Sequence, residues 1–258
     1  MDYVKIEKKG HIAVVTFCRP PMNAVDYQAY AEIGNAFRMI NKMPEISVAI
    51  LRAEGKGFCA GHDVGKLHNS DDAMNLDNMM VYPGVVNDSY RALNSCKAVV
   101  IGAIHGFCVA AGVAYASQCD MLICSDDAYF RLSEVLVGVV AGGCFASLLF
   151  PEKYARYMAI TGRKIPASEA VRFGSVLKTV PREQLDAEAM ALAEEIAGLS
   201  PTALSLLKTN MNMINPYNVE VKERIEHLGS VGPLERAECV RAFKEKRPGN
   251  FTLDIIGK

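Results

Sequence analysis

Short apolar, β-branched runs alternate with helical patterns along most of the chain. Each run predicts a strand, because it ends at a cluster of small or polar turn residues. The expected strands cover 11–18, 47–51, 98–104, 121–124, 129–132 and 176–180. Between the first two, Ile33, Phe37 and Ile40 lie on one helical face that begins after the candidate N-cap Asp26. Strands that alternate with helices indicate an α/β fold.

Beyond residue 186 the pattern contains helices only. Ser200-Pro201 is a strong start signal there, because Ser is a favoured N-cap and Pro a favoured first helical residue. We expect helices over 187–199, 203–213, 218–228 and 233–246. The chain therefore divides into a core, residues 1–198, and a C-terminal helical region, residues 199–258. A helical tail of this kind often packs on another subunit.

Length and charge narrow the possible partners. The 258 residues can bury a substantial core. With 28 basic and 29 acidic side chains, the formal net charge is −1, which gives no electrostatic reason to expect a nucleic acid or an anionic membrane. No apolar run is long enough to span a membrane, and residues 1–10 lack the apolar core of a secretory signal.

The cysteines and histidines carry no metal or disulfide pattern. The eight cysteines show no C-x-x-C spacing, and most lie in apolar runs, where a free thiol behaves as a small buried hydrophobe. A reducing compartment follows, so we expect a cytoplasmic location. The five histidines are scattered, and no phosphate-binding glycine motif is present. We therefore expect no metal site.

Two turns of small residues stand out as candidate chemistry. Ala60-Gly61-His62-Asp63 and the segment 106–112 each follow an apolar strand and lead into a segment of helical character. Small residues let the backbone approach a ligand, and a helix start presents N–H groups at the positive end of its dipole. Two such turns facing one point would form an oxyanion hole. The alternative is two close-packed turns that hold no ligand.

Glu134 is the most informative ionisable residue. It lies between apolar neighbours, just before the glycine-rich segment 141–143, and such a setting raises the pKa of a carboxyl group toward neutral pH. Glu134 is therefore a candidate acid/base, with a surface glutamate at a strand end as the alternative. His62 could act through its ring or only through its backbone N–H, and we favour the backbone. Asp63 has the alternative role of capping the following helix.

Residues 66–93 are polar and rich in methionine, and they end in a helix through Tyr90. Met74, Met79 and Met80 could line an adaptable apolar pocket or serve as ordinary packing.

Five motifs together resemble one family. They are RPPMNA, GKGFCAGHDVGKL, IHGFCVAAGVAYASQCD, FRLSEVLVGVVAGG and AFKEKRPGNF, which begin at residues 19, 55, 104, 130 and 242. Each alone is weak, but five in family order along essentially the whole chain are specific. The sequence resembles the crotonase family, also called the enoyl-CoA hydratase/isomerase superfamily.

The resemblance implies a spiral core of repeated ββα units and a C-terminal α-helical trimerisation region, in homotrimers or hexamers. It implies an acyl-CoA thioester substrate and no separate cofactor, since coenzyme A is part of the substrate. The thioester oxygen would lie between the backbone N–H groups of His62 and Ala111. The family usually has glycines at the second turn. Alanine keeps its N–H, so we expect the hole to survive in this chain.

The resemblance also implies contacts to substrate or coenzyme A. The positions that match such contacts are Ala24, Ala60, Asp63, Val64, Gly112, Phe243 and Lys246.

The carboxylates bear on the reaction. Hydratases of the family use two glutamates, of which the second matches Glu134 and the first falls on Ala114. A single acid/base suits double-bond isomerisation or an atypical hydratase. The Gly61-His62-Asp63 triplet resembles some decarboxylases of malonyl-type thioesters, although a Glu134 carboxylate would repel that substrate. A non-catalytic acyl-CoA-binding or RNA-binding member is the remaining alternative.

Overall fold

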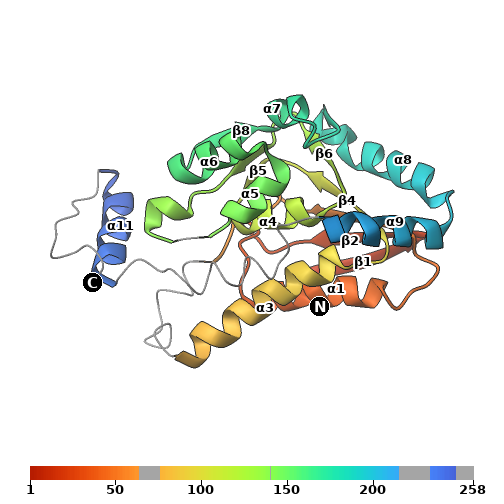
Figure 1. Cartoon of the computed structure of the whole chain (residues 1–258), viewed down its shortest axis with the longest axis horizontal. Helices are drawn as coiled ribbons and strands as arrows, with labels where there is room; N and C mark the ends of the chain where they lie inside the picture. The colour runs from red at the N-terminus through yellow and green to blue at the C-terminus, as the bar shows by residue number, and fades with distance from the viewer. Residues whose placement is uncertain (64–75, 140, 215–232, 248–258) are drawn as a thin grey trace.

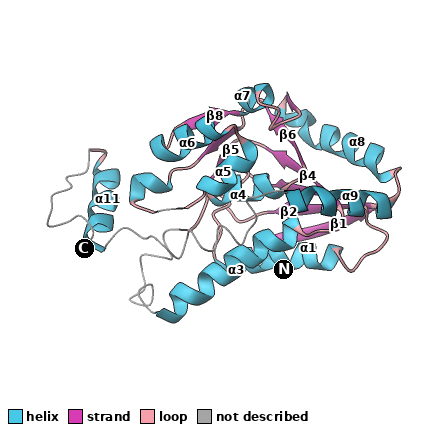
Figure 2. Ribbon diagram, viewed as in Figure 1, coloured by secondary structure: helices cyan, strands magenta, loops and turns pink. Residues whose placement is uncertain are grey.

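A six-stranded sheet forms the centre of the computed structural model, which describes residues 1–63, 76–139, 141–214 and 233–247 (Figures 1 and 2). Its strands run in the order β1-β2-β3-β4-β6-β9. The first pair is antiparallel and the others are parallel. Their bounds are β1 Val4–Lys9, β2 Ile12–Phe17, β3 Val48–Ala53, β4 Val99–Ile104, β6 Met121–Ser125 and β9 Lys178–Val180.

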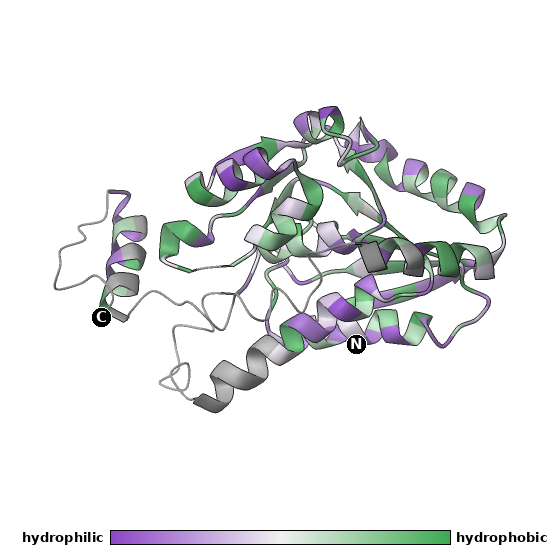
Figure 3. Cartoon of the chain, viewed as in Figure 1, coloured by the Kyte–Doolittle hydropathy of each residue, from purple (hydrophilic) through white to green (hydrophobic). Residues whose placement is uncertain are grey.

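Both faces of this sheet are covered, so its inner strands are apolar at nearly every position. Successive side chains point to opposite faces. Val14, Ile50 and Ile101 pack with helix α8, Leu185–Ala197, whereas Val15 and Leu51 belong to the larger cluster on the other face. That cluster includes residues of α1 (Tyr27–Ile40), α3 (Leu76–Asn94) and α4 (Ala111–Gln118). The strands are accordingly largely green in Figure 3.

A second, three-stranded sheet has the order β5-β7-β8. It consists of β5 Phe107–Val109, β7 Tyr129–Arg131 and β8 Lys164–Pro166. Two isolated parallel bridges connect earlier parts of the chain to this sheet. Cys59 pairs with Cys108 of β5, and Val25 pairs with His62.

These bridges reveal a repeated unit. Each of β2, β3 and β4 is followed first by a short extended segment beside the second sheet and then by a helix: Val25 with α1, residues 59–62 with α3, and β5 with α4. The predicted spiral of ββα units is therefore confirmed. Its consequence is that every short segment lies next to that of the following repeat, which places the two candidate turns side by side.

The remaining helices surround this core. They are η2 Glu134–Val137, α5 Gly143–Leu149, α6 Glu152–Thr161, α7 Ala167–Arg172, η3 Arg182–Gln184, α9 Pro201–Ile214 and α11 Pro233–Glu245. Helix α11 lies at one end of the molecule and contacts η2, far from α9 (Figure 1). The described part of the chain contains no helix whose length and apolar character would allow it to span a bilayer.

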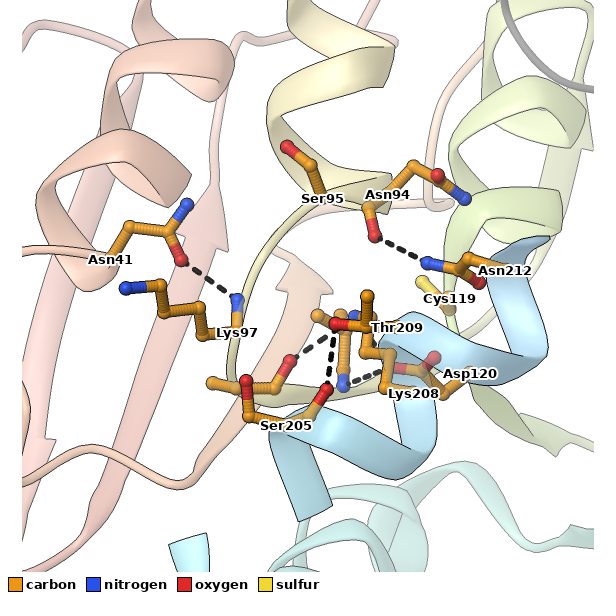
Figure 4. Close-up of polar contacts among 12 residues, drawn as sticks. Asn41, Asn94, Ser95, Lys97, Cys119, Asp120, Ser205, Lys208, Thr209 and Asn212 are labelled. Atoms are coloured by element: carbon orange, nitrogen blue, oxygen red, sulfur yellow. Dashed lines mark hydrogen bonds and ion pairs between the residues drawn. The ribbon is translucent and has the colours of Figure 1, made fainter. Parts of the chain in front are cut away.

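Helix α9 is fixed to the core by buried polar contacts (Figure 4). The Lys208 ammonium donates to the carbonyl of Ala98 at 3.1 Å and to the Asp120 carboxylate at 2.7 Å. The same Asp120 oxygen accepts from the N–H of Val100 at 2.7 Å. Asn212 donates to the carbonyl of Asn94 at 3.0 Å. These partners explain how a lysine is accommodated in a buried position.

Most predicted elements within the described residues are present, and the structure adds three strands that the sequence pattern does not predict. Strand β1 was not predicted because it is a charged, exposed edge strand, VKIEKK. Strand β5 lies within the small-residue turn 106–112, strand β8 was not predicted, and each has only three residues. Helix α5 begins at Gly143, the last residue of the glycine-rich segment 141–143. The predicted helix 218–228 and residues 66–75 of the methionine-rich segment lie outside the described residues, as do the side chains of Met79 and Met80.

Candidate active site

The two small-residue turns are in direct contact. Gly61 has φ +98°, and a Cβ added there would lie 2.8 Å from the Cβ of Ala110. A Cβ on Gly112 would lie 3.0 Å from both the Cβ and the carbonyl oxygen of Cys59. The strands leading into the turns are paired as well, since Val109 donates its N–H to the carbonyl of Cys59 at 2.9 Å. The glycines are thus required by a close approach of two backbones.

The direction of the His62 amide follows from its neighbours. The carbonyl of Gly61 accepts from the N–H of Val25 at 2.8 Å, and the N–H of Asp63 donates to the carbonyl of Val25 at 3.1 Å. In a trans peptide, C=O and N–H point in opposite directions. The N–H of His62 therefore points away from Val25, toward the side of segment 59–62 where β5 and the Ala110 turn lie.

Ala111 is the first residue of α4. The carbonyl of Ala110 accepts from the N–H of Ala114 at 3.2 Å, so the N–H of Ala111 in the same peptide points out of the amino end of the helix. Ala110 holds this turn with φ +51°, and its own N–H donates to the carbonyl of Arg131 at 2.9 Å. Where the family usually has glycines, this chain has Ala110, whose positive φ is in the left-handed region. The N–H of Ala111 still points out of the amino end of α4.

Glu134 begins helix η2, three positions after the Arg131 carbonyl that binds the Ala110 turn. Its side chain is half-buried, and its Oε2 atom is shielded from solvent. Gly142, at φ +76°, lies directly against it, because a Cβ there would be 2.9 Å from Oε1 of Glu134. The glycine-rich segment noted in the sequence therefore makes room for this carboxylate.

The His62 ring contacts a buried tyrosine. The Tyr30 hydroxyl, on α1, lies 3.0 Å from Nδ1 and 3.2 Å from Nε2 of His62, and 3.4 Å from the hydroxyl of Tyr90. Tyr115 joins the cluster, with its hydroxyl 2.8 Å from that of Ser89. These tyrosines carry no distinguishing signal in the sequence, because each occupies an apolar helix face like any core residue.

The Asp63 carboxylate is held by Arg19, the first residue of the RPPMNA motif. Nη2 of Arg19 donates to Asp63 at 2.7 Å and to Asp26 at 3.0 Å, and Nη1 donates to the carbonyl of Ala24 at 2.8 Å. Burial lowers the pKa of Arg19, but the hydrogen bond to Asp63 and the charge of Asp26 outweigh it, so the net pKa is raised. Ala60 donates its N–H to the carbonyl of Met22 at 3.2 Å.

The other predicted contact residues are less fully placed. Val64 lies outside the described residues, as does the side chain of Phe243 on α11. Lys246 follows α11 with φ +53° and is exposed. Because α11 contacts η2, this end of the chain lies beside the element that carries Glu134.

The cysteines near the turns are packing residues. Cys59 and Cys108 are free and buried, and burial raises the pKa of the Cys59 thiol to about 12. Such a thiol is a poor nucleophile at neutral pH. Across the described ranges, no group of three or more His, Cys, Asp or Glu side chains could hold a metal ion.

The comparison with known proteins decides the family. The sequence model described as enoyl-CoA hydratase/isomerase matches residues 7–253. The chain belongs to the enoyl-CoA hydratase/isomerase family. An enoyl-CoA is a CoA thioester, so the family is named for reactions of CoA thioesters.

Relatives within the enoyl-CoA hydratase/isomerase family have diverse activities. The chain is 31% identical to a (7aS)-7a-methyl-1,5-dioxo-2,3,5,6,7,7a-hexahydro-1H-indene-carboxyl-CoA hydrolase from Rhodococcus jostii, over 93% of this chain and 94% of the relative. It is 28% identical to a mitochondrial Delta(3,5)-Delta(2,4)-dienoyl-CoA isomerase from Dictyostelium discoideum, over 98% and 92%. A solved enoyl-CoA hydratase/isomerase structure from Pseudoalteromonas atlantica superposes with a TM-score of 0.83 at 25% identity, covering 97% of this chain and 100% of that one. This protein is therefore an enzyme of the family.

Proposed function

We propose that this enzyme binds an acyl-CoA thioester with its carbonyl oxygen between the N–H groups of His62 and Ala111. Glu134 would then move a proton to or from the resulting enolate. The observation that carries the proposal is the contact between Gly61 and Ala110, because it makes the residues that follow them, His62 and Ala111, neighbours. The amide of His62 points toward this junction, and that of Ala111 points out of its helix end.

The favoured reaction is double-bond isomerisation. The Glu134 carboxylate removes a proton from C2 of a 3-enoyl thioester, and the electron pair moves to the thioester oxygen, where two N–H donors stabilise it. The protonated Glu134 returns the proton at C4 while the electrons move back, so the double bond shifts to C2 and the mass is unchanged. Ala114 offers no second carboxylate for the concerted addition of water. The dienoyl-CoA isomerase relative supports this reaction.

Hydrolysis of a keto-substituted acyl-CoA is the second candidate, supported by the hydrolase relative at 31% identity. In this chain, water would add to a ketone β to the thioester, and cleavage of the carbon–carbon bond would release the thioester enolate. The same oxyanion hole would stabilise that enolate, and the carbon bearing the ketone would become a carboxylate. Decarboxylation of a malonyl-type thioester ranks below both, because the Glu134 carboxylate would repel the substrate's own.

The contacts to coenzyme A and the assembly are further parts of the proposal. Ala24, Ala60, Val64 and Gly112 would face the pantetheine or nucleotide, and no cofactor beyond the substrate is needed. A homotrimer or hexamer is supported by α9, which exposes apolar side chains on the C-terminal region. They are Leu199, which precedes the helix, and Leu206, Leu207 and Met211.

One product assay separates the candidates. The purified protein is incubated with 2-enoyl-, 3-enoyl-, 3-ketoacyl- and malonyl-type CoA thioesters, and the products are identified by mass, by charge and by the ultraviolet absorbance of a double bond conjugated with the thioester. A shifted double bond at unchanged mass is the expected result. Water gained as a hydroxyl would indicate hydration, water gained with a new carboxylate would indicate hydrolysis, and lost carbon dioxide would indicate decarboxylation. Tight binding of every thioester without turnover would contradict an enzymatic role.

A further inference from the structure

We propose that Arg19 is a positioning residue of the oxyanion hole, which fixes the His62 amide by clamping Asp63 to the segment 24–26. This inference rests on the proposed role of the His62 N–H. It assigns a function to a side chain that touches neither the thioester oxygen nor Glu134, and that acts through the backbone of the turn.

Three hydrogen bonds of the Arg19 guanidinium converge on one small region, and its Cζ also lies 5.4 Å from the centre of the Tyr3 ring. One guanidinium nitrogen, Nη2, donates to the carboxylates of both Asp26 and Asp63, and the other, Nη1, donates to the carbonyl of Ala24. The charged groups are largely removed from water, with 14% of the Arg19 side chain, 6% of Asp26 and 24% of Asp63 exposed. Pairs shielded to this degree have a stronger interaction than exposed surface pairs.

The backbone at both sides of the clamp is also fixed. Asp26 is the N-cap of α1 and accepts from the N–H of Ala29 at 3.0 Å, so it is tied to a long helix. Asn23 donates to the carbonyls of Glu54 and Gly57 at 2.7 Å and 2.9 Å, and accepts from the N–H of Arg19 at 2.8 Å. Segment 19–26 is therefore a rigid bracket beside the turn.

His62 lies between two residues that this bracket holds. Before it, the Gly61 carbonyl accepts from Val25, and after it, Asp63 is held by its N–H to Val25 and by its carboxylate to Arg19. Two backbone hydrogen bonds fix the direction of the His62 peptide, and both are made by the N–H and the carbonyl of the same residue, Val25. The Arg19–Asp63 ion pair adds a side-chain restraint between the turn and segment 19–26. Without it, residues 61–63 keep their two backbone hydrogen bonds to Val25 and the contact of the His62 ring with Tyr30, but they lose the ionic link to segment 19–26.

This role predicts a selective effect on the thioester carbonyl. A thioester and a thioether of coenzyme A share the nucleotide, the pantetheine and a short acyl or alkyl group, but only the thioester has an oxygen for the hole. The ratio of their affinities therefore reports on the hole and not on the fold. Misplacing one donor weakens an interaction that depends on sub-ångström geometry.

The experiment measures binding of acetoacetyl-CoA, an enolisable thioester, and of S-butyl-CoA, a thioether, by calorimetry, with the enolate followed by its ultraviolet absorbance. Arg19→Gln and Asp63→Asn are each expected to lower the thioester preference by about 10- to 100-fold and to reduce the enolate absorbance, with S-butyl-CoA binding unchanged in Arg19→Gln. Asp26→Asn keeps the cap and the Arg19–Asp63 pair, so its effect is expected to be smaller. Arg38→Gln is the control, because it removes an ion-paired arginine near the end of α1 whose partner is Asp88 on α3.

The outcomes are distinguishable. A lower melting temperature with an unchanged thioester preference in both Arg19→Gln and Asp63→Asn would overturn the inference, because a purely structural ion pair gives that result. Arg19→Lys, which keeps the charge but loses the planar fork, is expected to restore part of the preference if Arg19→Gln does not fold. A wild-type protein that binds both ligands equally would instead contradict the proposed function, and the inference with it.

Discussion

Gly61 and Ala110, from two different repeats of the spiral, touch so closely that a methyl group on Gly61 would lie 2.8 Å from the Cβ of Ala110. Both residues have positive φ, +98° and +51°. The pair is the point where the two turns interlock, and the residue after each is a candidate oxyanion donor. The small size of Gly61 and Ala110 therefore determines how closely the two donors can approach each other.

We expect Gly61→Ala to reduce both stability and turnover. The left-handed backbone costs about 1–3 kcal/mol for a non-glycine residue, and the contact with Ala110 adds an overpacking cost of about 1–3 kcal/mol. Thermal unfolding and steady-state turnover measure the two effects. Gly10→Ala is the control, because Gly10 has φ +60° with nothing within 4 Å of an added Cβ. The double variant Gly61→Ala/Ala110→Gly should regain the overpacking part, and no recovery in it would show that the contact does not set the turn.

The sequence predicts the two turns of this junction, but it does not predict which residues of the turns touch. Small residues after apolar runs identify both turns, because a close backbone approach leaves a local signature in residue size. The bridge from Cys59 to Cys108, which brings them together, depends on pairing between distant segments and leaves no such signature. The roles of Arg19 and Tyr30 could not be predicted from the sequence for the same reason. Their partners, Asp63 and His62, lie far along the chain, so neither stands out from a surface arginine or a core tyrosine.

Ala111→Pro should impair catalysis far more than Ala111→Gly. Ala111 is the first residue of α4, where proline is tolerated because its missing N–H has no partner within the helix. The substitution therefore removes a donor, and loss of one oxyanion donor lowers kcat about 100- to 1000-fold. Turnover is compared at equal helical content by circular dichroism. Equal activity of the two variants would remove the second turn from the oxyanion hole.

Glu134→Gln should keep acyl-CoA binding and lose turnover by about 100- to 10,000-fold, the usual contribution of one acid/base. Glutamine has the same shape and fits the space beside Gly142, but it cannot accept the substrate proton. Binding is measured by calorimetry and turnover with the thioester that the product assay identifies. Glu152→Gln, an exposed carboxylate paired with Arg156, is the control. Turnover that is unchanged in Glu134→Gln would mean that another group moves the proton.

The C-terminal region shows a second difference between pattern and structure. Helix α9 was predicted from its periodicity and its Ser-Pro start, which are local features. Its attachment to the core by Lys208 was not, because a lysine in a helix is ordinarily exposed. The burial of its ammonium depends on Ala98 and Asp120, which lie at the ends of β4 and α4 and become adjacent only in the folded chain.

Lys208→Met tests this anchor. Methionine fills a similar volume, but the Asp120 carboxylate loses its cation and the Ala98 carbonyl its donor, so we expect a loss of about 1–3 kcal/mol in the free energy of unfolding. Asp120 is partly exposed, which keeps the loss below that of a fully buried pair. Lys178→Met breaks the exposed pair with Glu188 and should change stability by less than about 0.5 kcal/mol. Denaturant unfolding gives both values, and limited proteolysis shows whether α9 detaches first. Similar small losses in the two variants would mean that the Lys208 contacts do not hold α9 on the core.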